Sequence, residues 1–217
     1  VGGGFIGLEM VENLVERGLN VTLVEKAPQI LTPLDEEMAI FVENELLKNN
    51  VKIIKGESAV EFQNAGKKVI LENGEVLTSD LTILSIGVKP ATEIVGEAGI
   101  ELGISGGILV DDRYETSIED IYAVGDAILV KQQITGEDAL ISLASPANRQ
   151  GRQVADIIAG YDRLNRGSIG TSIVRVFDIS AASTGLNERQ VKAAGFDYAV
   201  THTSAKHHAG YYPGAKM

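Results

Sequence analysis

The segment that decides the fold is VGGGFIGLEMVENLVERGLNVTLVE, residues 1–25. Gly2, Gly4 and Gly7 form a G-x-G-x-x-G pattern at the start of a predicted helix. In such a turn the first glycine permits a tight bend, the second lets the backbone approach a pyrophosphate, and the third lets the helix pack on the strand. Glu25 ends the next strand, about twenty residues on, where a carboxylate can accept the ribose hydroxyls of a dinucleotide. The segment therefore predicts an NADH site, with NADPH disfavoured because the carboxylate would repel a 2′-phosphate. The alternative is a purely structural βαβ turn.

The pattern of apolar residues in the first half of the chain predicts alternating strands and helices. Short Asn/Gly-containing turns separate three of the extended runs, which favours an antiparallel ribbon in place of a crossover helix. This order is typical of an α/β fold, a doubly wound Rossmann-type domain with a parallel sheet. The expected elements are a helix at 6–17, a strand at 20–25, a helix at 35–49, a strand at 51–55, ribbon strands at 59–63, 68–71 and 76–77, and a strand at 81–86.

The second half of the chain is expected to form two further regions. In residues 108–160 we expect strands at 108–110 and 121–124 and a helix at 147–159, with Ser145 as its N-cap and Pro146 in its first turn. Residues 160–170 are polar and rich in glycine, which is typical of a linker. The third region holds a strand at 173–176 and a helix at 187–194. We expect it to be an incomplete layer whose strand lacks sheet partners, so that it either exposes an edge that associates or is disordered.

Composition excludes several classes of function. The chain has 217 residues and a formal net charge of -11, which disfavours nucleic acid or an anionic membrane as a partner. It has no run of roughly 18 apolar residues, as a membrane span needs, and no leader segment, so we expect a cytoplasmic protein. There is no cysteine, and the three histidines, His202, His207 and His208, lack the spacing of a helical metal site, so no metal is expected. The glycine turn begins directly after Val1, although a strand should precede it, so we expect further residues before Val1.

Three segments, in this order, resemble the pyridine nucleotide-disulfide oxidoreductase superfamily: VGGGFIGLE at 1–9, SIGVKP at 85–90 and TSIEDIYAVGD at 116–126. The last is similar to the flavin-binding signature of that superfamily. The resemblance implies that Asp126 accepts hydrogen bonds from the ribityl chain of FAD and that Gly125 allows close approach. For an aspartate after a glycine, the alternative is a turn or cap.

Two further segments narrow the resemblance to one branch. ASPANRQGR at 144–152 and HAGYYPGA at 208–215 are similar to NADH oxidases, coenzyme A-disulfide reductases and NADH-dependent persulfide or polysulfide reductases. The resemblance implies an NAD-binding domain at 1–107, the C-terminal part of an FAD-binding domain at 108–160 and the start of an α+β dimerisation domain at 161–217. It also implies a homodimer, and an N-terminal FAD half with the redox cysteine that lies outside this chain.

The resemblance suggests roles for individual side chains. Glu9 would approach the nicotinamide amide, with Ile6 beneath the ring and Phe5 as a gate toward the flavin; for Phe5 and Ile6, core packing is the alternative. Gly87 ends a strand where the dinucleotide crosses the sheet edge. The remaining cofactor-binding and substrate candidates are Lys26, Ala144, Asn148 and Arg149, the last two with a solvated helix face as the alternative.

Tyr211 and Tyr212 resemble dimer-domain tyrosines that reach the redox cysteine of the other subunit, and packing aromatics are the alternative. The resemblance as a whole implies an enzyme that passes hydride from NADH through FAD to a disulfide, a persulfide or oxygen, with a small-molecule substrate. The terminal acceptor stays open. The alternatives are a reductase of a protein electron carrier and an NADH-binding module without catalysis; Asp126 argues against the latter. The chain alone is expected to be inactive.

Overall fold

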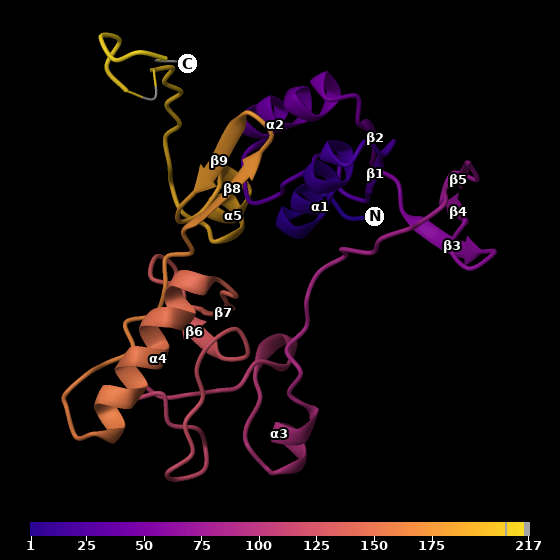
Figure 1. The fold of residues 1–217 in the computed structure, drawn as a ribbon. Coiled ribbons are helices and arrows are strands. Elements are labelled where there is room, and N and C mark those ends of the chain that lie inside the picture. Colours follow the sequence, from indigo (N-terminus) through magenta and orange to yellow (C-terminus); the bar gives the residue numbers. More distant parts are fainter. Residues whose placement is uncertain (207, 215–217) are drawn as a thin grey trace.

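A computed structural model describes residues 1–206 and 208–214 (Figure 1). Two helices and two parallel strands open the chain, and a separate ribbon follows them. A second helical region and a final hairpin with a short helix complete it. The elements are α1 (Phe5–Glu16), β1 (Thr22–Glu25), α2 (Glu36–Lys48), β2 (Lys52–Lys55), β3 (Ala59–Gln63), β4 (Lys68–Leu71), β5 (Val76–Thr78), α3 (Glu93–Glu97), the short 3-10 helix η1 (Ile104–Gly106), β6 (Leu129–Lys131), β7 (Asp138–Leu140), α4 (Ala144–Ile158), β8 (Ser172–Val176), β9 (Ile179–Ser183) and α5 (Glu188–Ala193).

The parallel sheet of the first region is confirmed. β1 pairs with β2 in parallel, and the backbone N–H of Gly2 donates to the Val24 carbonyl oxygen at 2.8 Å. On the other side of Val1, its ammonium donates to the Ile83 carbonyl oxygen at 2.7 Å and its own carbonyl oxygen accepts from Ser85 N–H at 2.8 Å. The spatial order is therefore β2, β1, residues 1–2 and residues 83–85, which is the order of a doubly wound sheet.

The expected strand at 81–86 is wrong as a regular strand. Residues 81–92 carry no assigned element. The backbone hydrogen bonds of residues 81–86 in the described chain all go to Val1, and a single residue supports one bridge rather than a ladder. The ribbon, in contrast, is confirmed: β3, β4 and β5 form a three-stranded antiparallel sheet. Val69 and Leu71 of β4 pack with Val24, which anchors the ribbon to β1.

In the second region the expected strands at 108–110 and 121–124 are wrong. Ile108 makes only isolated bridges, to Leu102 and Ile128, and Tyr122 bridges Glu115 alone. Because these are isolated bridges and not consecutive residue pairs, no ladder forms. The regular strands are instead β6 and β7, an antiparallel hairpin that the sequence analysis did not predict.

The helix of the second region is confirmed, but it begins earlier than expected. α4 starts at Ala144, and its N-cap is Leu143, which makes no side-chain cap. Ser145 and Pro146 therefore lie inside the first turn, and Ser145 is not the cap. Pro146 is the third helical residue, where a backbone N–H would have no intrahelical partner, so its ring costs the helix no hydrogen bond.

The third region has partners after all. β8 and β9 pair as an antiparallel hairpin, and Figure 1 shows this hairpin beside α1 and α2. Val174 and Val176 are buried in the same core cluster as Leu8 and Val42. The expectation that the apolar strand lacks sheet partners is therefore wrong for residues 172–183. The expected last helix is confirmed as α5, and Asn187 closes a capping box at its start.

The buried residues form two main cores and a small third cluster. One main core unites α1, α2, β1 and β8, and the other joins residues around Ile100, Tyr114 and Ile128 to α4. The division into domains at residues 107 and 160 stays a prediction. Among residues 1–206 and 208–214, no helix is both long and apolar enough to cross a membrane.

Candidate functional site

The three glycines of the turn have different roles: two are required by the packing, and one leaves the surface accessible. Gly2 has φ of +102°, and a Cβ there would collide with the Ser85 carbonyl oxygen. A Cβ at Gly7 would collide with the Gly2 carbonyl oxygen. A Cβ at Gly4 would meet no atom within 4 Å. Gly2 and Gly7 are therefore required by the packing of the turn, whereas Gly4 leaves space that a ligand can occupy.

The first turn of α1 offers backbone donors. Its N-cap, Gly4, has no side-chain cap, and the first intrahelical bond runs from Leu8 N–H to the Gly4 carbonyl oxygen at 3.0 Å. In the described part of the chain, the N–H groups of residues 5–7 have no hydrogen-bond partner. Free amides and the positive end of the helix dipole together make this turn a site for a phosphate group.

Glu25 joins the end of β1 to the glycine turn. Its Oε2 accepts from Gly3 N–H at 2.6 Å, and its Oε1 accepts from Ala27 N–H at 2.7 Å. These bonds fix the half-buried carboxylate, and each oxygen keeps lone-pair capacity for a further donor. Burial lowers the pKa of the Val1 ammonium, and the negative charge of Glu25 opposes that shift. The carboxylate is thus preorganised to accept hydroxyl groups at the carboxyl end of β1.

A cleft of about 1000 Å³ connects these features, at the upper end of the roughly 300–1,000 Å³ typical of small-molecule sites. It runs from the glycine turn past the carboxyl end of β1 to the first turn of α4 and the start of β8. Nine of the residues predicted from the sequence line it: Gly2, Gly4, Phe5, Ile6, Glu9, Glu25, Lys26, Gly87 and Ala144.

The sequence allows two interpretations of Phe5 and Ile6, core packing and contact with the nicotinamide, and the structure distinguishes the two residues. Phe5 is half-buried, packs against the core of the first region and also lines the cleft. Ile6 is 54% exposed and lines the cleft, so core packing does not account for it. Glu9 is exposed on the same helix and also faces the cleft.

Comparison with known proteins identifies this arrangement. A family model described as pyridine nucleotide-disulphide oxidoreductase matches residues 1–151. The chain belongs to this family. Among curated relatives it is 34% identical to an NAD(P)H sulfur oxidoreductase (CoA-dependent) of Pyrococcus abyssi, over all of this chain and 49% of that protein. It is 33% identical to a coenzyme A disulfide reductase of Staphylococcus aureus, over 99% of this chain and 48% of that protein.

The solved structures agree. The reduced Bacillus anthracis CoADR-RHD superposes with a TM-score of 0.96 at 47% identity, over 99% of this chain and 39% of that one. An NAD-dependent persulfide reductase from A. fulgidus gives a TM-score of 0.95 at 35% identity, over 99% of this chain and 40% of that one. The expected superfamily and branch are confirmed. The chain spans about half the length of the curated relatives it matches.

The flavin residues expected from the family signature lie outside the cleft, beside α4. Gly125 has φ of +88° and open space where a Cβ would be, and its N–H donates to Gln150 Oε1 at 2.7 Å. Asp126 is exposed, and its backbone carbonyl oxygen accepts from the Ser142 hydroxyl at 3.3 Å. Their role in binding FAD stays a prediction.

Four other predicted residues do not line the cleft. Asn148 is exposed, and its Oδ1 accepts from Arg152 Nη1 at 3.0 Å, while Arg149 points into a different cavity. Tyr211 and Tyr212 are exposed, at 83% and 55%, with ring centroids 4.7 Å apart. Core packing therefore does not explain the two tyrosines, and their reach toward another subunit stays a prediction.

One histidine lies beside a cluster of carboxylates at the starts of α2 and α5. His202 Nε2 lies 2.7 Å from Glu37 Oε1, and His207 falls outside the described residues. Asp35, Glu37 and Glu188 can bring carboxylate oxygens within 4.8 Å of one another. Asp35 already accepts from Glu188 N–H at 2.9 Å. A backbone hydrogen bond and, after it, the hydrogen bond with His202 lower the pKa of Glu37.

Sequence reasoning missed several parts of the cleft, among them the segment after β2 and the start of β8. Glu57, Ser58 and Ala59 line it directly after β2. The rule that ligands lie beyond the carboxyl ends of parallel strands could have found them. Thr171, Ser172 and Ile173 enter it from β8. No local pattern signals that contribution, because it depends on how the hairpin packs against α1.

Proposed function

We propose that this chain is the nicotinamide-nucleotide-binding part of an FAD-dependent oxidoreductase, which passes hydride from NADH through flavin to a disulfide, a persulfide or oxygen. The observation that carries the proposal is the single cleft shared by the glycine turn, Glu25 and the first turn of α4. Bound FAD supplies the hydride acceptor and the route for electrons. The residues of this chain bind and orient the nucleotide.

The glycine turn would hold the pyrophosphate. The amides of residues 5–7 are free to donate, and Gly4 leaves the backbone accessible. Glu25 would accept the ribose hydroxyls, since its two oxygens are fixed by the amides of Gly3 and Ala27. This fit rests on free donors, an oriented acceptor and an open approach.

Lys26 sets a limit on the selectivity for NADH. It is exposed beside Glu25 and lines the same cleft, so its ammonium would attract a 2′-phosphate. An exposed, flexible ion pair contributes about 0.2–1 kcal/mol, whereas hydrogen bonds to a charged acceptor contribute about 1.5–3 kcal/mol. The oriented Glu25 therefore outweighs Lys26, and NADH is preferred by a moderate factor.

The first turn of α4 is a suitable place for the hydride acceptor. Ala144 and Ser145 line the cleft, and Leu143 provides no side-chain cap for the helix. The N-terminus of α4 can therefore stabilise negative charge in the cleft. Ile6 and Glu9 line the same cleft, where the nicotinamide would be placed.

The proposal extends to the full-length protein. We infer an NAD-binding domain at 1–107, part of an FAD-binding domain at 108–160 and the beginning of a dimerisation domain at 161–217. The exposed pair Tyr211 and Tyr212 supports a homodimer, since it offers aromatic surface that the described chain does not cover. A small-molecule substrate and a cytoplasmic location complete the proposal.

Calorimetric titration with NADH and NADPH tests the nucleotide site. We expect NADH to bind more tightly, and Glu25→Ala to weaken NADH by roughly 1.5–3 kcal/mol because two ribose hydrogen bonds are lost. Glu16→Ala is the matched control, since Glu16 is an exposed carboxylate of α1 that does not line the cleft. Equal affinity for both nucleotides, or an equal loss in the two variants, would contradict the role of Glu25.

A further inference from the structure

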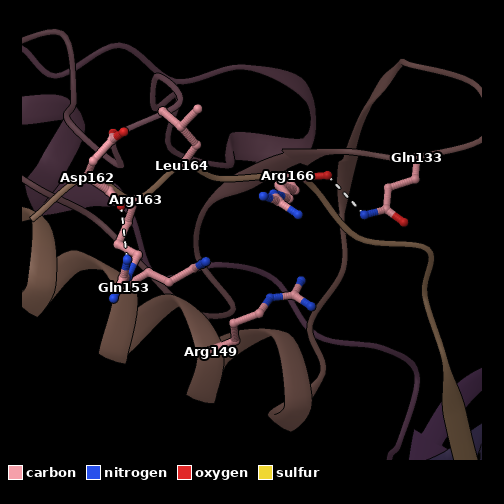
Figure 2. Close-up of a pocket in the computed structure, with 7 residues that line it drawn as sticks. All are labelled: Gln133, Arg149, Gln153, Asp162, Arg163, Leu164 and Arg166. Carbon is pink, nitrogen blue, oxygen red and sulfur yellow. Dashed lines mark hydrogen bonds between the residues drawn. The ribbon is translucent and has the colours of Figure 1, made fainter.

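A second cavity, of about 400 Å³, lies between α4 and the loop at residues 162–166. It shares no lining residue with the nucleotide cleft. Three arginines line it, Arg149, Arg163 and Arg166, although the chain has a formal net charge of -11. Figure 2 shows the arginine side chains around this opening. A local cationic pocket on an acidic protein can select an anion that the rest of the surface repels.

Two of the three arginines have donors to spare. Arg149 Nη2 donates to the Gly167 carbonyl oxygen at 3.0 Å, which orients the guanidinium and leaves most of its five N–H groups. The Arg166 side chain has no hydrogen-bond or ion-pair partner among the described residues. Its backbone carbonyl oxygen accepts from Gln133 Nε2 at 3.0 Å, which holds the loop in place. In Figure 2 the guanidinium groups of Arg149 and Arg166 face the same gap.

A third donor reaches the pocket from α4. The Tyr114 hydroxyl donates to Gln153 Oε1 at 2.7 Å, so the amide oxygen of Gln153 is engaged and its NH₂ group is left to donate. Burial raises the pKa of the Tyr114 phenol, although the charge of Arg149 opposes this, so Tyr114 keeps its proton at neutral pH. The hydrogen bond therefore fixes Gln153 as a donor.

The acidic groups nearby do not neutralise this pair of arginines. Arg163 Nε lies 2.8 Å from Asp156 Oδ2, so Asp156 is paired with the third arginine. Asp162 lines the cavity, but Figure 2 shows its carboxylate on the side away from Arg166. Arg149, Arg166 and Gln153 thus present donors, with no acceptor of comparable strength between them.

We propose that this pocket binds the phosphate group of a small phosphate monoester. Guanidinium groups match the oxygens of a phosphate in pairs of N–H···O bonds, and the Gln153 amide supplies a further donor. A cavity of about 400 Å³ leaves room for an organic part beside Leu164. Free inorganic phosphate shares this chemistry, and the experiment separates the two sources.

The test is calorimetric titration of the protein with glycerol 3-phosphate, with inorganic phosphate and with glycerol as the uncharged control. We expect glycerol 3-phosphate to bind more tightly than inorganic phosphate, and glycerol not to bind. Saturating NADH should leave this affinity unchanged, because the two cavities share no residue. Inorganic phosphate binding as tightly as the ester would overturn the choice of a monoester, and displacement by NADH would overturn the separate site.

Variants locate the phosphate. Arg166→Gln and Arg149→Gln should each weaken glycerol 3-phosphate at least tenfold, or about 1.4 kcal/mol. Arg166→Gln is the cleaner of the two, since Arg149 also holds the Gly167 carbonyl oxygen. Arg152→Gln is the matched control, because Arg152 is also on α4 but outside the pocket, with Nη1 donating to Asn148 at 3.0 Å; its effect should stay within twofold. An equal loss in Arg152→Gln, or no binding to the unaltered protein, would overturn the proposal.

Discussion

The nucleotide cleft and the arginine pocket offer different donors to the phosphate groups that we propose they bind. The cleft presents backbone N–H groups at the first turn of α1, with Glu25 as an oriented acceptor. The pocket presents the side chains of Arg149, Gln153 and Arg166. Backbone donors need a local turn, which a short glycine pattern encodes. Side-chain donors need elements that are distant in sequence to pack together, so only the fold reveals them.

The largest expected effect is the difference in stability between two glycine variants of the cleft, Gly2→Ala and Gly4→Ala. Gly2→Ala would force a side chain into a φ of +102° and against the Ser85 carbonyl oxygen, so we expect unfolding to be easier by roughly 2–4 kcal/mol. Gly4→Ala meets nothing within 4 Å and has φ of -80°, so it should leave stability within about 1 kcal/mol. It should nevertheless weaken NADH at least tenfold, because the methyl group occupies the approach to the pyrophosphate. Denaturant unfolding and calorimetry measure the two effects, and similar behaviour of both variants would break the comparison.

The next effect tests whether the hairpin of the third region belongs to the cleft. Val176 is 0% exposed in the core shared with α1, so Val176→Ala should cost roughly 1–3 kcal/mol of stability. Ile173 is 72% exposed and lines the cleft. Ile173→Ala should leave the unfolding midpoint nearly unchanged and weaken NADH two- to fivefold. If Ile173→Ala left the NADH affinity unaltered, β8 would be a support for the cleft and not part of its wall.

A smaller effect concerns Tyr114, which is buried beside the arginine pocket and donates to Gln153 Oε1. Burial raises the pKa of its phenol above the ordinary value, which is near 10 in an unfolded chain. The protonated phenol therefore makes its full contribution to the free energy of unfolding below about pH 10. That contribution is lost as the pH rises through the pKa of the phenol in the folded state. Tyr114→Phe should remove that alkaline loss. Unfolding measured between about pH 8 and pH 11 gives the slope, and an unchanged slope in the variant would assign it to another group.

The variant Tyr114→Phe also tests whether the side-chain donors of the arginine pocket act independently of the nucleotide cleft. Without the Tyr114 hydroxyl, Gln153 Oε1 loses the bond of 2.7 Å that orients its amide. Glycerol 3-phosphate should then bind two- to threefold more weakly, while NADH affinity stays constant. Parallel titrations of both ligands provide the measurement, and an equal change in both would show that Tyr114 acts through general stability.

How much the sequence predicted depends on the range of the interactions. Residues 1–25 predicted the turn, α1 and β1 because each feature depends on neighbours within a few residues. The turns at 64–66 and 73–74 predicted the ribbon for the same reason. The strand at 121–124 failed because an apolar run does not show whether a partner strand is present. β6 and β7 were missed, since their three-residue strands carry too short a pattern.

In the candidate site, too, the residues set by short-range interactions were predicted and those set by long-range packing were not. Gly4, Glu25 and Gly87 were predicted and line the cleft. The contribution of Ile173 could not be predicted, because its place depends on Val174 and Val176 packing against α1. The sequence predicts Ser145 as the N-cap, but the helix begins at Ala144, and Ser145 lies in its first turn and in the cleft wall.

The shared core of α1, α2 and β8 has a consequence for motion. Two walls of the nucleotide cleft, the glycine turn with α1 and the start of β8, are attached to one packed core, although about 165 residues separate Ile6 from Thr171. A bound nucleotide therefore opposes local opening of the hairpin as well as of the glycine turn. Amide hydrogens of β8 and β9 should exchange with solvent more slowly when NADH is present, whereas those of β6, whose Val130 packs in the second core, should keep their rate.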